Sequence, residues 1–473
     1  MILVICVHIL VLISLLWTIS KRGVEGALPL AVCFLVIFPE EAKLHLGVFD
    51  LTVQRLVTLV LLAASLLTKG NADGPRSLPL KSGIIFVGLW WTIATLDSIN
   101  FMASFKALLS LFLDYFTVYV IFAKRISNEK TPGKLVGGAV DGLIVLCVFG
   151  MLEAYKQWSV VSLFPTMVHR FGVSGTLYVD DARGLRIQST FGHPILFGSA
   201  LAMGIPMVLH LLTGVQSRAR RLWLWLGLMM MFICIFKASS RGPWIALLVS
   251  LLLCFLFGQS RMRKYVATLA VIATLAMVVR PGVWETIQND YGATVDDHSS
   301  QGESYIYRYE LYRLVMQRVG EDPARLLWGY GPQAFTDLHL VGAINGRGMR
   351  FVSCDSSFAA LLAETGYVGL ASMSLLLFYP LLFAFRTYRR MEGANQQLCL
   401  VLVTSLMTFL FQMTNVAILG WGQQTILFWI VIAMTMTFPA ICAREIEQNG
   451  SEELILTWQG EHASNAIRAA SSV

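Results

Sequence analysis

Apolar runs long enough to cross a membrane, separated by short polar breaks, dominate this chain. A helix needs about 20 mostly apolar residues to span the hydrocarbon, where no backbone polar group can remain unpaired. Such runs are predicted at 2–19, 24–39, 51–68, 83–96, 104–123, 135–152, 194–213, 221–238, 243–258, 264–280, 367–385, 397–418 and 424–442. The pattern predicts an all-α, polytopic transmembrane helix bundle of about 12 to 13 spans.

Composition excludes a soluble protein. Of 473 residues, 56% are hydrophobic and 14% are charged, whereas soluble domains carry about 25% charged residues. The formal charge of +7 does not indicate nucleic-acid binding, because most Lys and Arg residues stand in small clusters between apolar runs. We therefore expect a membrane domain over residues 1–442, a polar cytoplasmic tail over 443–473, and no nucleic-acid partner.

Basic clusters fall in alternate connections, as expected when positively charged loops stay in the cytoplasm. They comprise Lys21 and Arg22; Lys69, Arg76 and Lys81; Lys124, Arg125, Lys130 and Lys134; Arg218, Arg220 and Arg221; Arg261, Arg263 and Lys264; and Arg386, Arg389 and Arg390. The other connections then face outward, and two of them are long, at 153–192 and 281–366. Long connections in compact proteins usually carry function, so we expect the chemistry in these two outer loops.

The second outer loop has helical character of its own. Ser300 and Glu303 form a capping box, which predicts a helix that ends at Gly320. One face of this amphipathic helix is predicted to carry Tyr305, Tyr309, Tyr312, Met316 and Val319. A second, short helix is predicted over 351–366, with Asp355 at or beside its N-terminus and Gly366 at its end.

Four motifs follow one another in these loops. Arg186-Ile-Gln-Ser-Thr-Phe-Gly-His-Pro194 and Ser240-Arg-Gly-Pro-Trp244 each open a predicted span. Tyr307-Arg-Tyr-Glu-Leu-Tyr312 comes before Asp322-Pro323 and Gly329-Tyr-Gly331, and Asp355-Ser-Ser-Phe358 comes before Glu364 and Gly366. Their order and content over about 180–440 resemble the O-antigen ligase and O-antigen (exopolysaccharide) polymerase superfamily of membrane glycosyltransferases.

The resemblance implies transfer of glycan from a polyprenyl-pyrophosphate carrier, such as undecaprenyl pyrophosphate, to a glycan acceptor. It implies the bacterial cytoplasmic (inner) membrane, with the active loops on the periplasmic side. Cofactors are not implied, and the partners would be the lipid-linked oligosaccharide, the acceptor, membrane lipids and polysaccharide export or chain-length proteins.

Four positions depart from the family pattern. Asp355 stands where the ligases carry a histidine, which favours the branch that polymerises surface polysaccharide over the ligase that transfers polymer to lipid A-core. Ser189 replaces a glycine of the first motif. Tyr307 and Tyr312 replace a glycine and a tryptophan of the third motif.

The residue chemistry fits such a transfer. Pyrophosphate is a good leaving group that needs cations, and the planar fork of arginine binds phosphate oxygens in pairs. Arg186 and Arg241 are assigned to substrate binding and Arg308 to catalysis, although an arginine at this depth can also bind lipid head groups. Asp355 is assigned as the base that accepts a proton from the attacking hydroxyl, with simple helix capping as the alternative.

His193, Tyr305 and Tyr312 complete the predicted substrate site. His193 could bond phosphate or sugar, or only end a helix, and the tyrosines could stack on sugar rings or belong to an interfacial aromatic belt. Asp180-Asp181 and Asp296-Asp297-His298 suggest a divalent metal by residue type, but the resemblance implies none. We therefore assign no metal ligands.

Two other classes of protein compete with this interpretation. A transporter for lipid-linked glycan would explain ionisable residues inside predicted spans, namely Asp114 and Asp141, which could instead pair with Arg55 or other polar groups. Repeated halves, which many transporters have, are not found in the sequence. The second competitor is a non-catalytic subunit of a polysaccharide export system.

Overall fold

The computed structural model describes residues 2–47, 49–68, 78–164, 177–180, 183–279 and 300–445, together with residues 282, 288 and 292. Most of the predicted tail therefore lies outside the described residues. Within them the chain is an all-α polytopic bundle, as predicted, and the strands form three short antiparallel hairpins.

Eight described helices are long and apolar enough to span a membrane. They are α1 (Ile2–Ile37), the continuous helix Phe101–Arg125, α6 (Lys130–Lys156), α7 (Pro194–Gly214), α8 (Arg218–Lys237), α14 (Ser357–Tyr388), α15 (Gly393–Gln412) and the C-terminal helix Gly422–Glu445. Phe101–Arg125 consists of α4 (Phe101–Ser110), a π-helical turn η1 (Leu111–Phe116) and α5 (Thr117–Arg125).

The remaining helices are shorter or lie at the ends of the bundle. Three short apolar ones are α2 (Val53–Leu67), α3 (Lys81–Leu96) and α9 (Arg241–Phe257). The others are α10 (Ser260–Val279), α12 (Ser300–Gly320), α13 (Pro323–Trp328) and the 3-10 turns η2 (Val160–Leu163), η4 (Ala334–Leu338) and η5 (Ile418–Gly420). The hairpins pair β1 (Lys43–Leu46) with β2 (Phe49–Thr52), β3 (Tyr178–Asp180) with β4 (Gly184–Arg186), and β5 (Val341–Ile344) with β6 (Arg347–Arg350).

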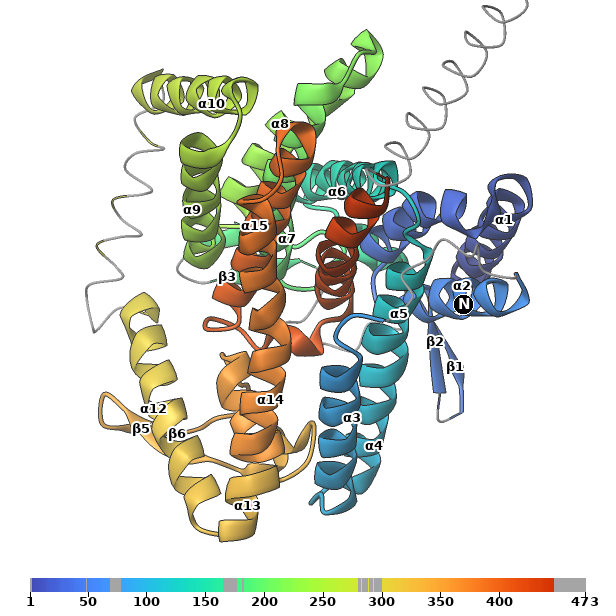
Figure 1. Cartoon of the computed structure of the whole chain (residues 1–473). Coiled ribbons are helices and arrows are strands. Elements are labelled where there is room, and N and C mark those ends of the chain that lie inside the picture. The colour runs from blue at the N-terminus through green and yellow to red at the C-terminus, as the bar shows by residue number, and fades with distance from the viewer. Residues whose placement is uncertain are drawn as a thin grey trace, which may run out of the picture.

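All thirteen predicted runs contain a helix in the described structure, but in two places a pair of predicted helices is joined into one. The first two runs form one continuous helix, α1, which is interrupted only at Gly23, where φ is 70°. The break expected at Gly366 is present, with φ 67°, and it divides α14 into a short outer segment and a longer one. The run at 264–280 forms α10, which lies across the end of α9 (Figure 1).

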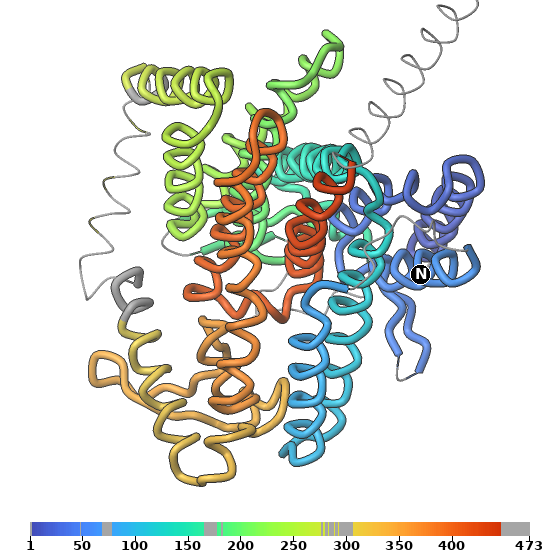
Figure 2. Tube along the Cα trace, in the orientation of Figure 1, coloured from blue at the N-terminus to red at the C-terminus, as the bar shows by residue number. Residues whose placement is uncertain are grey.

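Segments far apart in the sequence meet in the bundle. Figure 2 shows the blue and cyan N-terminal part of the chain beside the orange and red C-terminal part. The indole of Trp90 on α3 donates to the carbonyl of Thr365 on α14 (3.0 Å), and the hydroxyl of Tyr115 on η1 donates to the carbonyl of Leu419 (3.0 Å). The two halves of the sequence therefore share one apolar core.

A second, smaller core lies beneath α12, at the end of the bundle that also carries α13 and the β5–β6 hairpin (Figure 1). Leu311, Val315 and Val319 are fully buried there, whereas Tyr309 is 68% exposed and Met316 is 54% exposed. Of the face predicted from the sequence, Val319 and in part Tyr312 pack into this core, whereas Tyr309 and Met316 do not. Aliphatic side chains at four-residue spacing pack on α14 and β5, so these side chains rather than the tyrosines form the main buried face of α12.

Candidate functional site

A cavity of about 1380 Å³ opens among the starts of several helices. One wall comes from the N-terminal third of the chain, namely the end of α1, the β1–β2 hairpin and the α4–η1 helix. The other wall comes from the β3–β4 hairpin and from the starts of α7, α9, α14 and the C-terminal helix. A cavity of this size exceeds the usual range of about 300–1,000 Å³ for small-ligand pockets, so it suits a large substrate.

Four helices direct their N-termini at this cavity. Ile195, Gly242, Ser357 and Gly422, which belong to their first turns, all line it. The first N–H groups of a helix lack partners within the helix, and the helix dipole makes this end partially positive. Together the four ends favour an anion before any charged side chain is considered.

Arg186 is the most buried cation of the cavity, with 2% of the residue exposed. Its Nε donates to the carbonyl of Ala238 (3.1 Å) and one terminal nitrogen donates to Ser240 Oγ (2.6 Å). Its guanidinium lies over the ring of Tyr178, 5.3 Å from the centroid. Burial, and then the charge of Arg183, lowers the pKa of Arg186 to about 10, so it stays charged at neutral pH.

Arg308 and Asp355 come from different elements and lie together in the cavity wall. A terminal nitrogen of Arg308, on α12, is 3.9 Å from Asp355 Oδ2 and donates to the carbonyl of Asn415 (3.4 Å). Asp355 stands just before Ser356, the N-cap residue of α14, and accepts a hydrogen bond from Ser353 Oγ (3.4 Å). Burial raises the pKa of Asp355, and the neighbouring Arg308 only partly offsets this.

His193 is the N-cap of α7, and its ring lines the cavity. Nδ1 accepts a hydrogen bond from the backbone N–H of Ile195 (3.2 Å), which leaves the proton of a neutral ring on Nε2. Burial, followed by the charges of Arg186 and Arg183, lowers the pKa of His193 to about 3. The imidazole is therefore neutral at physiological pH and acts as a hydrogen-bond donor through Nε2.

The structure brings most of the predicted site residues together. Five line the same cavity: Arg186, His193, Arg241, Arg308 and Asp355. Tyr312 does not line it, because its hydroxyl bonds to Ser356 Oγ beneath the start of α14. The side chain of Tyr305 lies outside the described part of the chain.

Backbone packing fixes the start of the Asp355 segment. The N–H of Ser357 donates to the carbonyl of Met413 (2.8 Å), and Ser357 Oγ donates to that of Val416 (3.1 Å). Farther along α14, a side chain on Gly366 would begin 2.3 Å from the carbonyl oxygen of Leu327. The predicted Gly-Tyr-Gly and Glu-x-Gly motifs therefore pack backbone against backbone and need glycine for space as well as for conformation.

Ser189 also has a backbone conformation that favours glycine. Its φ is 53°, a left-handed conformation that side chains disfavour, at the position where the family motif carries glycine. The carboxylate of Glu153 holds the turn by accepting the N–H groups of Gln188 (3.0 Å) and Ser189 (2.8 Å). This turn leads from Arg186 to His193.

On the opposite wall of the cavity, Asp114 pairs with Arg55, a pairing that the sequence suggested without placing it in the site. Arg55 donates to both carboxylate oxygens of Asp114, and also to Ser110 Oγ (2.7 Å) and the carbonyl of Asp50 (2.7 Å). Asp141, the second suspect inside a span, pairs with Arg220 (2.5 Å). A charge inside an apolar run was a usable signal for Asp114, but its partner is 59 residues away in the sequence.

The acidic pairs considered for metal binding do not form a cluster in the described structure. The carboxylate of Asp180 contacts Arg183 (2.9 Å) and Arg186 (3.4 Å). No group of three or more His, Cys, Asp or Glu side chains that could hold a metal occurs among the described residues. Asp181 and Asp296-Asp297-His298 lie outside them.

Part of the cavity lies in a segment that matches a known sequence family. Residues 226–374 match the family described as O-antigen ligase. This match supports the O-antigen ligase and polymerase superfamily for the chain. It bears out the superfamily predicted from the motifs and supports a multi-pass membrane enzyme of the ligase or polymerase type, a family that implies lipid-linked glycan substrates. No curated protein matches the chain.

The O-antigen ligase match covers only part of the cavity. It includes Arg241, Arg308, Asp355 and Glu364, whereas Arg186, His193 and the whole N-terminal wall lie outside the matched residues.

Proposed function

We propose that the protein transfers glycan from a polyprenyl-pyrophosphate carrier to a hydroxyl of another carrier-linked glycan, and so polymerises surface polysaccharide. The observation that carries the proposal is the convergence of Arg186, Arg241 and Arg308 with Asp355 in one cavity at four helix N-termini. Charged donors held in place before the reaction stabilise the charge that develops on a leaving group.

The arginines would hold the donor diphosphate as its bond to the sugar breaks. Arg186 is fixed by its bonds to Ala238 and Ser240, and Arg241 is the first residue of α9, where the helix dipole adds to its charge. The neutral Nε2–H of His193 would donate to a phosphate or sugar oxygen. A cation fork and a neutral donor together match a diphosphate that carries a sugar.

Asp355 would take the proton in the same step. The acceptor hydroxyl attacks the anomeric carbon, the bond from that carbon to the diphosphate oxygen breaks, and the hydroxyl proton passes to the carboxylate. Attack opposite the leaving group inverts the anomeric centre. A raised pKa makes the Asp355 carboxylate a stronger base than an exposed aspartate, provided that it is ionised.

Substitutions in this pair test the enzymatic assignment. We expect Arg308→Ala and Asp355→Asn to abolish long surface glycan in cells, with carrier-linked repeat units accumulating, while protein levels stay normal. Arg313→Ala is the matched control, because Arg313 lies on the same helix, is exposed and pairs with Glu310. Normal polymer length in both Arg308→Ala and Asp355→Asn cells would refute the site.

A deletion strain separates polymerase from ligase. A polymerase is favoured because Asp355 stands where the ligases of the family carry histidine. Deletion of a polymerase should leave single repeat units on the carrier, which gel analysis of lipid-linked glycan would detect. Full-length polymer that stays on the carrier would instead identify a ligase.

A further inference from the structure

Gln333 occupies a strained position at the edge of the cavity. Its φ is 64°, in the left-handed region that costs stability for any residue with a side chain. It is exposed, although its neighbours Gly331, Pro332, Ala334 and Phe335 are all buried. Strain at one exposed residue in a buried run indicates a function for its side chain.

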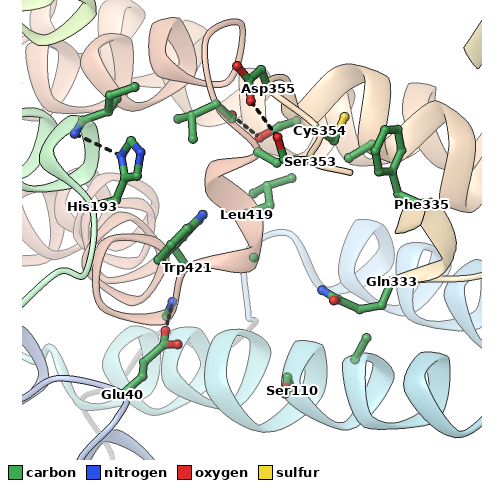
Figure 3. A pocket seen from close by; sticks show the side chains of 18 of the residues that line it. Glu40, Ser110, His193, Gln333, Phe335, Ser353, Cys354, Asp355, Leu419 and Trp421 are labelled. Carbon is green, nitrogen blue, oxygen red and sulfur yellow. Dashed lines mark hydrogen bonds between the residues drawn. The ribbon is translucent and has the colours of Figure 1, made fainter. Parts of the chain in front are cut away.

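The backbone around Gln333 is held from several directions. The N–H of Gly331 donates to the carbonyl of Glu364 (2.9 Å), the carbonyl of Pro332 accepts from Ser104 Oγ (2.6 Å), and the N–H of Gln333 bonds to the Glu364 carboxylate. These contacts fix the strained conformation. They also aim the amide of Gln333 into the cavity (Figure 3), where no described residue forms a hydrogen bond with it.

Trp421 projects from the opposite side of the same space (Figure 3). One side of its ring packs on His193, with 6.1 Å between ring centroids. Its backbone is held because the next residue, Gly422, donates its N–H to the carboxylate of Glu40. Gly420, next to Trp421, lies near the Gln333 amide, because a Cβ built on it would make van der Waals contact with Gln333 Nε2 at 3.9 Å.

We propose that Gln333 and Trp421 form a subsite for the sugar ring of the acceptor glycan. This inference rests on the proposed function and names where its second substrate binds. An amide both donates and accepts, so it can bond two neighbouring sugar hydroxyls, and an indole offers an apolar face to the ring. His193 lies on the other side of Trp421, and Asp355 lies at the edge of the same space (Figure 3).

The substitution Gln333→Gly separates binding from folding. Glycine removes the amide and relieves the strain, so the variant should unfold at a higher temperature than the wild type. The full-length protein in detergent would be tested with two probes: oligosaccharide fragments of the strain's own surface polysaccharide, and inorganic pyrophosphate. We expect the dissociation constant for the fragments to rise about ten-fold, the size of one or two lost hydrogen bonds.

Controls make each outcome decisive. Pyrophosphate binding should change less than two-fold in Gln333→Gly, Gln333→Asn should lose less glycan affinity, and Trp421→Phe should bind better than Trp421→Ala. Unchanged fragment affinity in Gln333→Gly, or no fragment binding to the wild type, overturns the subsite. Failure of the wild type to bind pyrophosphate counts against the diphosphate site instead and leaves the fragment result to stand alone.

Discussion

At the scale of single residues, burial in the cavity leaves an arginine charged but makes a histidine neutral. Arg186 keeps its charge although it is buried, because a pKa of about 10 is still above neutral pH. His193 loses its charge for the same physical reason, since burial beside cations lowers the pKa of His193 to about 3. The arginines can thus neutralise an anion, while the neutral imidazole can only orient it by donating a hydrogen bond.

The pH dependence of the reaction should reveal Asp355. A base works when ionised, so activity should rise as pH increases through the pKa of Asp355, which burial raises. Ser353 Oγ donates to this carboxylate and lowers its pKa. Ser353→Ala should therefore move the acidic limb of the activity profile of isolated membranes to higher pH. An acidic limb that stays in place would mean that another group titrates there.

The motifs could name only part of the site. Arg186, His193, Arg241, Arg308 and Asp355 stand in or beside recognisable patterns, which is why they could be named in advance. Gln333 carries no such signal, because its left-handed backbone is set by Glu364 and Ser104, which come from two other helices. Trp421 is likewise one of twelve tryptophans, and nothing in the local sequence marks it.

At the scale of elements, the outer part of α14 depends on contact between two backbones. A Cβ on Gly329 would lie 2.5 Å from the backbone of Glu364, and one on Gly366 would lie 2.3 Å from that of Leu327. Both glycines also have positive φ. The loop after α13 therefore positions the segment that carries Asp355 and Glu364.

Gly366→Ala should break this contact. The overlap and the left-handed backbone together should cost about 3 kcal/mol or more of folding stability. The measurement is the unfolding temperature of the purified protein in detergent, with polymer length in cells as the second readout. Gly348→Ala, in the β5–β6 hairpin with open space around it, serves as the control and should behave as wild type. Equal stability of the two variants would contradict the packing argument.

The pattern of apolar runs predicts where helices occur, but it does not predict their interruptions or local geometry. Length and hydropathy identify each run, because every backbone group in lipid needs a partner within its own helix. The same pattern does not show that α1 continues through Gly23 or that Leu111–Phe116 forms a π-helical turn. The sequence also could not tell which face of α12 is buried, since only the structure shows that α14 and β5 cover Leu311 and Val315.

At the scale of the whole molecule, α7, α9 and α14 all run away from the cavity toward basic connections. Their far ends meet, because Arg261 donates to the carbonyl of Thr213 (3.1 Å) and the hydroxyl of Tyr388 donates to that of Phe257 (2.7 Å). Arginines and lysines cluster beside these ends in the sequence. The positive-inside tendency therefore predicts that the starts of these helices, and the cavity, lie on the outer side.

Cysteine labelling tests this orientation. We expect Arg347→Cys, in the exposed β5–β6 hairpin, to react with a membrane-impermeant maleimide once the reagent reaches the periplasm. Arg390→Cys, between α14 and α15, should react only after the cytoplasmic membrane is opened. The unsubstituted chain gives the background from its native cysteines. The reverse pattern of labelling would place the cavity in the cytoplasm.

The three short apolar helices also affect the lipid around them. At 15, 16 and 17 residues, α2, α3 and α9 rise only about 22 to 26 Å, less than the roughly 30 Å of a bilayer's hydrocarbon. All three border the cavity through Arg55, Trp91 and Arg241. We predict that the bilayer thins beside them, which is one way in which lipid adapts to a short span. The carrier of the proposed function would then need less depth of lipid to bring its head group level with the arginines.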